Sequence, residues 1–195
     1  MANLSDFLPA AGGGGGGGIP KYEEFTSSGT FTPTQALIDA GGKVSLFMVG
    51  AGASGYNGGS WYKGGEGGEV IFVFNTLTNT NSITITIGSG SANSAGGNTI
   101  FTGSTAGGTD ITAYGGSYST NRSVWTNNRL TSGYPGIYNG IDYNHGAGSG
   151  TFGYGAGGAG YYEPGVYNPK PNSGQGGQYS NNAGASGFVR ITWFE

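Results

Sequence analysis

The chain has 195 residues, of which 45 are glycine, 13% are aromatic and only 9% are charged, with a formal net charge of −3. This length suits one domain with a real core; glycine occurs without the Gly-X-Y period of collagen, and the low charge and many aromatics favour an ordered chain over a disordered one. The absence of cysteine excludes disulfides, and with a single histidine, His145, it also excludes zinc clusters, so we expect no metal and no cofactor. No cluster of basic residues is present, which argues against nucleic acid or an anionic membrane as a partner.

Residues 1–21 are expected to form an N-terminal anchor and a polyglycine segment. Leu4, Phe7 and Leu8 make a small apolar group just before the uninterrupted run Gly12–Gly18. One interpretation is a frayed terminus with a flexible linker. The other is an attachment segment that docks into another protein or bundles between subunits. No basic segment followed by an apolar stretch of signal length opens the chain, so we expect synthesis and assembly in the cytosol.

Residues 22–195 are expected to form one all-β, antiparallel β-sandwich-like domain with long glycine-rich loops. Short apolar runs separated by Gly, Asn and Ser predict seven strands, at Glu24–Phe31, Lys43–Val49, Glu69–Phe74, Ser82–Ile87, Asn98–Thr102, Thr109–Tyr114 and Gly187–Phe194. One helix of barely two turns is predicted at Thr34–Ala40, between Pro33 and Gly41-Gly42.

Period-two alternation predicts which side chains of these strands are buried. The clearest case is Ser82–Ile87, and the expected buried side chains of this and two other strands are Ile83, Ile85, Ile87; Val70, Phe72, Phe74; and Val189, Ile191, Trp193.

Gly50, Gly52 and Gly55 follow the strand Lys43–Val49 with the spacing of a dinucleotide-binding fingerprint. The residues that follow have no helical periodicity, so no helix N-terminus is predicted to hold a pyrophosphate, and the match is attributed to chance. Glycines between strands, up to about residue 112, are interpreted as turns. For the glycine-richest stretches two structures are possible: extended polyglycine-like strands bonded through their backbones, or turns and bulges of a sandwich, the latter favoured for Gly146–Gly160.

The sequence predicts no catalytic site. His145, Asp142 and Ser149 lie within one glycine-rich loop and are not held by separate rigid elements, as a catalytic triad requires. No spacing pairs the carboxylates as in a glycosidase; the carboxylates considered are Glu66, Glu69, Asp110, Asp142 and Glu163.

Residues 115–182 are expected to form display loops, because strand signals fade there and Gly, Asn, Ser and Tyr dominate. Tyr and Trp give large rigid contact areas, while Ser, Gly and Asn give adaptable hydrogen bonds, as in antibody loops. Alternatively these aromatics fill a trimer or sandwich core. The candidate host-binding residues are Tyr118, Arg122, Trp125, Arg129, Tyr134, Tyr138, Tyr143 and His145. Such loops would suit either a polysaccharide or a loop of an outer-membrane protein.

Four segments resemble the glycine-rich domains at the ends of bacteriophage tail-fibre and receptor-binding proteins. These are residues 30–55, 64–70, 83–90 and 184–193, and the opening Leu-Ser-Asp-Phe-Leu-Pro before a glycine run is similar as well. The resemblance implies a virion protein attached to the phage tail or baseplate, homotrimeric assembly and host recognition by distal loops. It carries no binding residue into 115–182, and a structural adaptor or cap without host contact remains the alternative.

Overall fold

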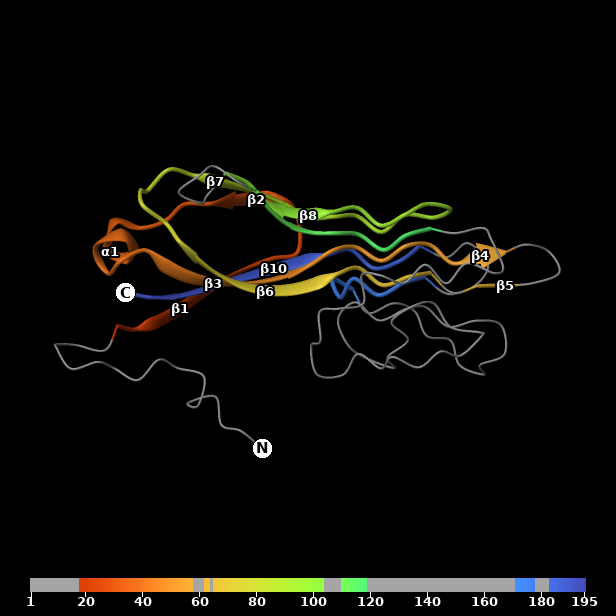
Figure 1. Ribbon diagram of the computed structural model, residues 1–195, viewed down its shortest axis with the longest axis horizontal. Helices are drawn as coiled ribbons and strands as arrows, with labels where there is room; N and C mark the ends of the chain where they lie inside the picture. The colour runs from red at the N-terminus through yellow and green to blue at the C-terminus, as the bar shows by residue number, and fades with distance from the viewer. Residues whose placement is uncertain (1–17, 58–61, 64, 104–109, 119–170, 178–182) are drawn as a thin grey trace, which may run out of the picture.

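The computed structural model describes residues 18–57, 62–63, 65–103, 110–118, 171–177 and 183–195, and these residues form mostly antiparallel β structure (Figure 1). The first four-stranded sheet has the order β1-β10-β3-β6, made of β1 (Pro20–Phe25), β10 (Phe188–Phe194), β3 (Lys43–Val49) and β6 (Val70–Thr76). The second has the order β2-β7-β8-β9, made of β2 (Gly29–Phe31), β7 (Ile83–Thr86), β8 (Thr99–Phe101) and β9 (Ile111–Ala113). The prediction of an all-β, antiparallel chain is confirmed.

Side chains of both sheets meet in one hydrophobic core. Leu46, Val189 and Ile191 of the first sheet and Ile85 and Phe101 of the second are completely buried in it. Across the layers the rings of Phe31 and Trp193 pack edge to face at 5.4 Å between centroids. The alternation predicted for the strands at residues 82–87 and 187–194 therefore correctly identifies the core residues, with Ile87 only partly buried.

The prediction for β6 is wrong in its choice of face. Phe72 and Phe74 are 56% and 79% exposed, whereas Ile71 and Val73 pack partly against the core. Every residue from Val70 to Phe74 is apolar, so alternation alone could not distinguish the two faces. Val70 lies on the same outer side as the two phenylalanines, but it is buried in a smaller cluster with Phe47, Val49 and Phe188.

The single strand predicted at Glu24–Phe31 is two strands in the structure. β1 pairs with β10 in the first sheet, and β2 pairs with β7 in the second, so the chain crosses between the layers at residues 26–28. Phe25 and Phe31 are both buried on the two sides of this crossing. The sequence Thr-Ser-Ser-Gly at 26–29 is typical of a bend.

The predicted helix is present as α1 (Gln35–Asp39). The Thr34 hydroxyl caps its N-terminus by accepting a hydrogen bond from the Leu37 amide at 3.0 Å. Gly41 and Gly42 follow with φ of 99° and 66°, a left-handed conformation that favours glycine and ends the helix. Leu37 is the one residue that α1 buries in the core.

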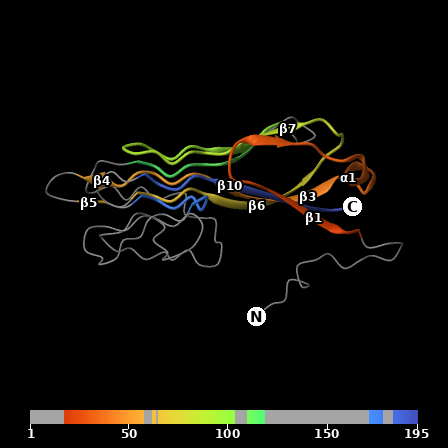
Figure 2. The same ribbon diagram turned by 180° about the vertical axis from the view of Figure 1, so that it is seen from behind.

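Beyond the sheets the chain continues as extended glycine-rich segments, which run side by side away from α1 and the C-terminus (Figures 1 and 2). We call them the glycine layer; its described segments are 50–55, 65–69, 88–91, 94–98, 114–118, 174–177 and 183–187. At the far end lies a short hairpin of β4 (Tyr56–Asn57) and β5 (Tyr62–Lys63), which the sequence did not predict. Most glycines between the described strands are thus extended and do not form turns. Gly146–Gly160 lies outside the described residues.

Candidate functional site

The glycine layer is held together by backbone hydrogen bonds between its segments. The amides of residues 50–54 reach three different segments in turn, with the carbonyls of Glu69, Gly97, Ala185, Glu66 and Ser94 as acceptors at 2.8–3.0 Å. The partner segment therefore repeats every third residue. This is the period of a polyproline II-type helix, which has three residues per turn and no internal hydrogen bonds.

Segment 50–54 also accepts bonds from two further segments. The amide of Gly116 donates to the carbonyl of Ala51, and the amide of Gly177 donates to the carbonyl of Ala53, at 2.8 and 2.7 Å. Five segments thus surround one central segment. A β-strand can bond only two neighbours, so this segment is linked to more neighbours than a strand of a sheet.

Only glycine allows such close packing at many of these positions. A Cβ atom built on Gly52, Gly68, Gly96, Gly115 or Gly184 would lie well under 3.0 Å from a backbone carbonyl of the neighbouring segment. Because these obstacles are backbone atoms, no side-chain rotation removes the clash. The high glycine content is therefore a packing requirement in this part of the molecule.

The two ends of the molecule differ in character. Segments 50–55, 114–118 and 174–177 run parallel and lead away from the sheets. Gly50 lies against Tyr114 and Gly174, and further along the same direction the carbonyls of Ala51 and Ala53 accept from the amides of Gly116 and Gly177. The opposite end carries α1, Gly18 and Glu195, where the amide of Ile19 donates to the carbonyl of Glu195 at 2.7 Å. The layer thus connects an end that holds Gly18 and the C-terminus with an end where loops begin.

Of the candidate host-binding residues, the structure describes Tyr118 alone. It is half-buried at the end of segment 114–118, which runs towards β4 in Figure 1. The others, Arg122, Trp125, Arg129, Tyr134, Tyr138, Tyr143 and His145, lie outside the described residues, as do the candidate attachment residues Leu4, Phe7 and Leu8. The far end of the glycine layer is therefore where the display region 115–182 begins.

The β4–β5 hairpin adds residues to this end that the sequence prediction omitted. Residues 56–63 read Tyr-Asn-Gly-Gly-Ser-Trp-Tyr-Lys, the same mixture of aromatic and small polar residues as 115–182. This composition could have indicated a further display loop at residues 56–63. In the sequence analysis the stretch serves only as evidence that no helix follows Gly55.

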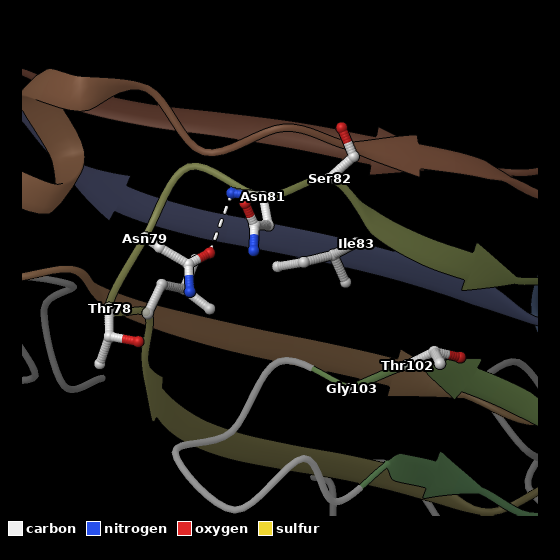
Figure 3. Close-up of a pocket in the computed structure, with 8 residues that line it drawn as sticks. Thr78, Asn79, Asn81, Ser82, Ile83, Thr102 and Gly103 are labelled. Carbon is white, nitrogen blue, oxygen red and sulfur yellow. Dashed lines mark hydrogen bonds between the residues drawn. The ribbon is translucent and has the colours of Figure 1, made fainter.

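Away from the far end, one cavity of about 100 Å³ lies beside the connection between β6 and β7 (Figure 3). Asn79, Asn81 and Thr102 contribute to its polar lining, and the Asn81 amide donates to the Asn79 side chain at 2.9 Å. Ligand pockets usually enclose about 300 Å³ or more, so this cavity suits a few water molecules. It belongs to the end opposite Tyr118.

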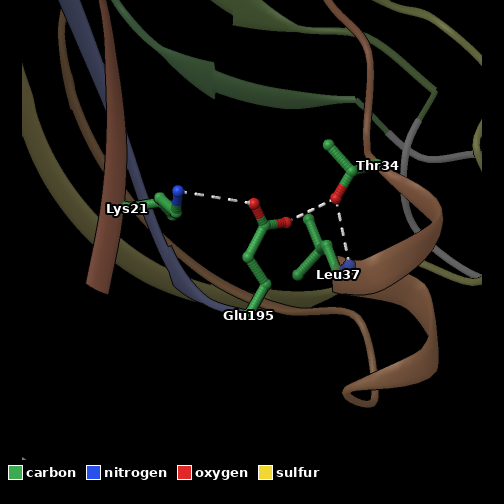
Figure 4. A network of polar contacts seen from close by, with 4 residues as sticks. All are labelled: Lys21, Thr34, Leu37 and Glu195. Carbon is green, nitrogen blue, oxygen red and sulfur yellow. Dashed lines mark hydrogen bonds and ion pairs between the residues drawn. The ribbon is translucent and has the colours of Figure 1, made fainter. Parts of the chain in front are cut away.

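A network of polar contacts joins Glu195 to Thr34 and Lys21 at the α1 end (Figure 4). The Glu195 carboxylate accepts a 2.5 Å hydrogen bond from the Thr34 hydroxyl and lies 4.0 Å from the Lys21 ammonium. The hydrogen bond from Thr34 and, more weakly, the charge of Lys21 lower the pKa of the Glu195 carboxyl. The cap of α1, the end of β10 and the start of β1 are thereby tied together.

In the part of the chain that the structure describes, no group of three or more His, Cys, Asp or Glu side chains could hold a metal ion. Nor does any helix within the described ranges have the length and apolar character needed to cross a membrane.

Comparison of the chain with family models, with curated proteins and with solved structures finds no match.

Proposed function

We propose that this chain is a bacteriophage receptor-binding protein, a tail-fibre adhesin without catalytic activity. A β-sandwich-like body attaches to the virion tail through the N-terminal segment with Leu4, Phe7 and Leu8. The loops of 115–182, together with residues 56–63, recognise the host cell surface.

The observation that carries this proposal is the two-ended glycine layer. A densely bonded backbone layer connects the end with Gly18 and Glu195 to the end where the hairpin β4–β5 and Tyr118 lie. Binding residues are commonly found on loops held by a rigid scaffold, and this layer is such a scaffold. It would hold the display loops away from the point of attachment.

The composition of the display region supports a binding surface and a receptor of the cell envelope. Its Tyr, Trp, Asn and Gly residues suit contacts with sugar rings or with an exposed protein loop, and its few charges suit neutral ligands. The receptor is thus a surface polysaccharide or an outer-membrane protein. Periodate treatment of cells destroys the former and protease treatment destroys the latter, so the loss of binding after one treatment identifies the class.

An adsorption assay tests the proposal. Purified protein should bind susceptible cells and compete with the phage that carries it, and Trp125→Ala or Tyr138→Ala should weaken that competition at least tenfold. Tyr22→Ala, which removes a 70% exposed tyrosine from the sheet body, is the matched control and should compete like the unmodified protein.

Two results would contradict the proposal. Protein that binds virions but never cells would favour the structural adaptor or cap. Release of reducing ends from host polysaccharide would show a depolymerase.

A further inference from the structure

The first sheet exposes large aromatic side chains on the side that faces away from the core. These residues come from β1, β10 and β6, and they are Tyr22, Phe194, Phe72 and Phe74, which are 70%, 41%, 56% and 79% exposed. We call the four together the outer aromatic face. Soluble proteins seldom expose large apolar groups side by side, and such a patch marks a place where another segment or molecule binds.

The register of the strands joins these residues into one surface. One row of opposed residues crosses all four strands in the order Tyr22, Thr192, Ser45 and Phe74. Phe72 lies two positions from Phe74 on β6, and their rings pack edge to face at 5.2 Å. The smaller side chains of Ser45 and Thr192 thus lie between the aromatic side chains of the two outer strands.

Farther along the strands, the same outer side is covered. The residues buried there form the smaller hydrophobic cluster of Phe47, Val49, Val70 and Phe188. The outer aromatic face is therefore the part of this side that lies towards the start of β1. Residues 1–17 join the described chain at that point, next to Ile19, whose side chain is 65% exposed.

We propose that residues 4–8 of this chain pack against the outer aromatic face in the free protein. Three of these five residues, Leu4, Phe7 and Leu8, have large apolar side chains. Packing them against aromatic rings removes apolar surface of both partners from water.

The charges of the two partners are also complementary. Asp6 has the only charged side chain in residues 1–18, and it lies between the apolar residues of the segment. Lys43 is exposed at the start of β3, opposite Thr76, and alternates with the buried Val44, so it lies on the outer side. It offers a cation beside the aromatic side chains.

The length of the glycine run fits this contact. Eleven residue steps lead from Leu8 to Ile19, and a glycine-rich linker of that length has an end-to-end distance of about 17–20 Å. From Ile19 to Phe74 the path is three strand spacings across the sheet and three residues along it, or about 18 Å in a straight line. A linker that matches the span in this way gives an effective concentration of the order of millimolar.

The contact belongs to the protein before it joins a virion. Leu4, Phe7 and Leu8 are also the proposed attachment residues, so they would leave the face when a tail protein binds them. The inference goes beyond the proposed function and does not depend on it, because the sheet face and the linker length are the same whatever the chain attaches to.

Hydroxyl-radical labelling of the full-length protein, measured at single residues by mass spectrometry, tests the contact. At an effective concentration of about 4 mM, a local dissociation constant of about 1 mM leaves about a fifth of the molecules undocked. Phe72 and Phe74 should therefore be labelled about fivefold faster after the combined substitution Leu4→Ser, Phe7→Ser and Leu8→Ser. Tyr114, which is 43% exposed in the glycine layer, should be labelled equally in both proteins.

A matched variant controls for changes in the segment itself. Ala2→Ser, Asn3→Ser and Ala10→Ser together alter the same number of residues but leave the three large apolar side chains in place. Labelling of Phe72 and Phe74 should stay as slow as in the unmodified protein. Circular dichroism checks that the sheets fold in both variants.

A cross-linking pair tests where the segment lies. The chain contains no cysteine, so Pro9→Cys with Thr76→Cys places one thiol beside the segment and one beside Phe74. The control is Pro9→Cys with Thr84→Cys, an exposed position on the outer side of the second sheet. Mild oxidation should link the first pair only, and the product should keep the single-chain mass of 19.6 kDa.

Four outcomes overturn the inference. The first two are equal labelling of Phe72 and Phe74 with and without the apolar residues of the segment, and equal cross-linking of the two cysteine pairs. The third is a cross-linked product of twice the chain mass, which would make a second copy the occupant. The last is a face that is labelled fast in the free protein and protected on virions, which would make a tail protein the occupant.

Discussion

Gly68 illustrates how single residues determine the packing of the glycine layer. Its amide donates to the carbonyl of Gly174 at 2.8 Å, and a Cβ atom there would overlap the carbonyl group of Gly50. The residue has a backbone conformation that alanine could adopt, so its requirement for glycine is spatial. Gly103 is the opposite case, with φ of 69° and no atom of the described residues within 4 Å of an added Cβ.

Alanine at these two glycines should therefore have different effects on stability. Gly68→Ala forces two backbones apart, and we expect a loss of about 3 kcal/mol in the free energy of unfolding, the upper part of the range for overpacking. Gly103→Ala should lose about 1 kcal/mol, the cost of a left-handed conformation. Chemical denaturation of both variants gives the comparison. Equal losses would show that the segments of the layer are not in direct contact.

Glu195 should make folding stability depend on pH. Its pKa is lowered in the folded protein relative to the ordinary value of 4.5, so the ionised carboxylate stabilises the fold at neutral pH. That stabilisation is complete above about pH 5 and is lost as the pH falls through the folded-state pKa. Melting temperatures of the unmodified protein and Glu195→Gln should differ at pH 7 and converge as the pH falls through the folded-state pKa. A constant difference would contradict the assignment.

At the scale of elements, the short helix depends on one hydroxyl. Thr34 caps α1 and also donates to Glu195, so Thr34→Ala removes both interactions. We expect a loss of about 1 kcal/mol, the usual effect of removing an N-cap. Thr34→Ser keeps the hydroxyl and should retain most of the stability. Thermal unfolding of the two variants separates the hydroxyl from the methyl group, and similar losses in both would contradict the capping role.

The strands could be predicted from the sequence where apolar and polar residues alternate, as at Ile83–Thr86 and Phe188–Phe194. They could not be assigned to faces where both faces are apolar, as in Val70–Phe74, because burial there depends on whether a neighbouring layer covers the strand. The crossing between β1 and β2 was missed because strands in different sheets can follow each other without a change in hydrophobic pattern.

Composition alone allows two structures for the glycine-rich segments, extended strands bonded through their backbones or turns and bulges. A glycine-rich segment has the same composition whether it turns or extends, and the difference lies in bonds to distant segments. The amide of Gly52, for example, bonds Ala185, more than a hundred positions away. Local sequence signals describe neighbours along the chain, so they carry no information about such a partner.

At the scale of the whole molecule, the body and the layer are stabilised by different interactions. The two sheets enclose an ordinary hydrophobic core, whereas the layer consists of backbone bonded to backbone and extends beyond that core. The candidate site was predicted by composition alone, and of its residues only Tyr118 is placed by the structure. Its position at the end of a segment of the layer agrees with a display role, which the adsorption assay tests.

The orientation of this chain on the phage particle tests the proposed function most directly. Cryo-electron microscopy of virions, with a tag inserted between Gly58 and Gly59, locates the far end of the glycine layer. Our account predicts that the tag lies at the distal tip of a tail fibre, farther from the capsid than the body with Glu195. A chain at an internal joint of the tail, with the tag enclosed by other tail proteins, would contradict it.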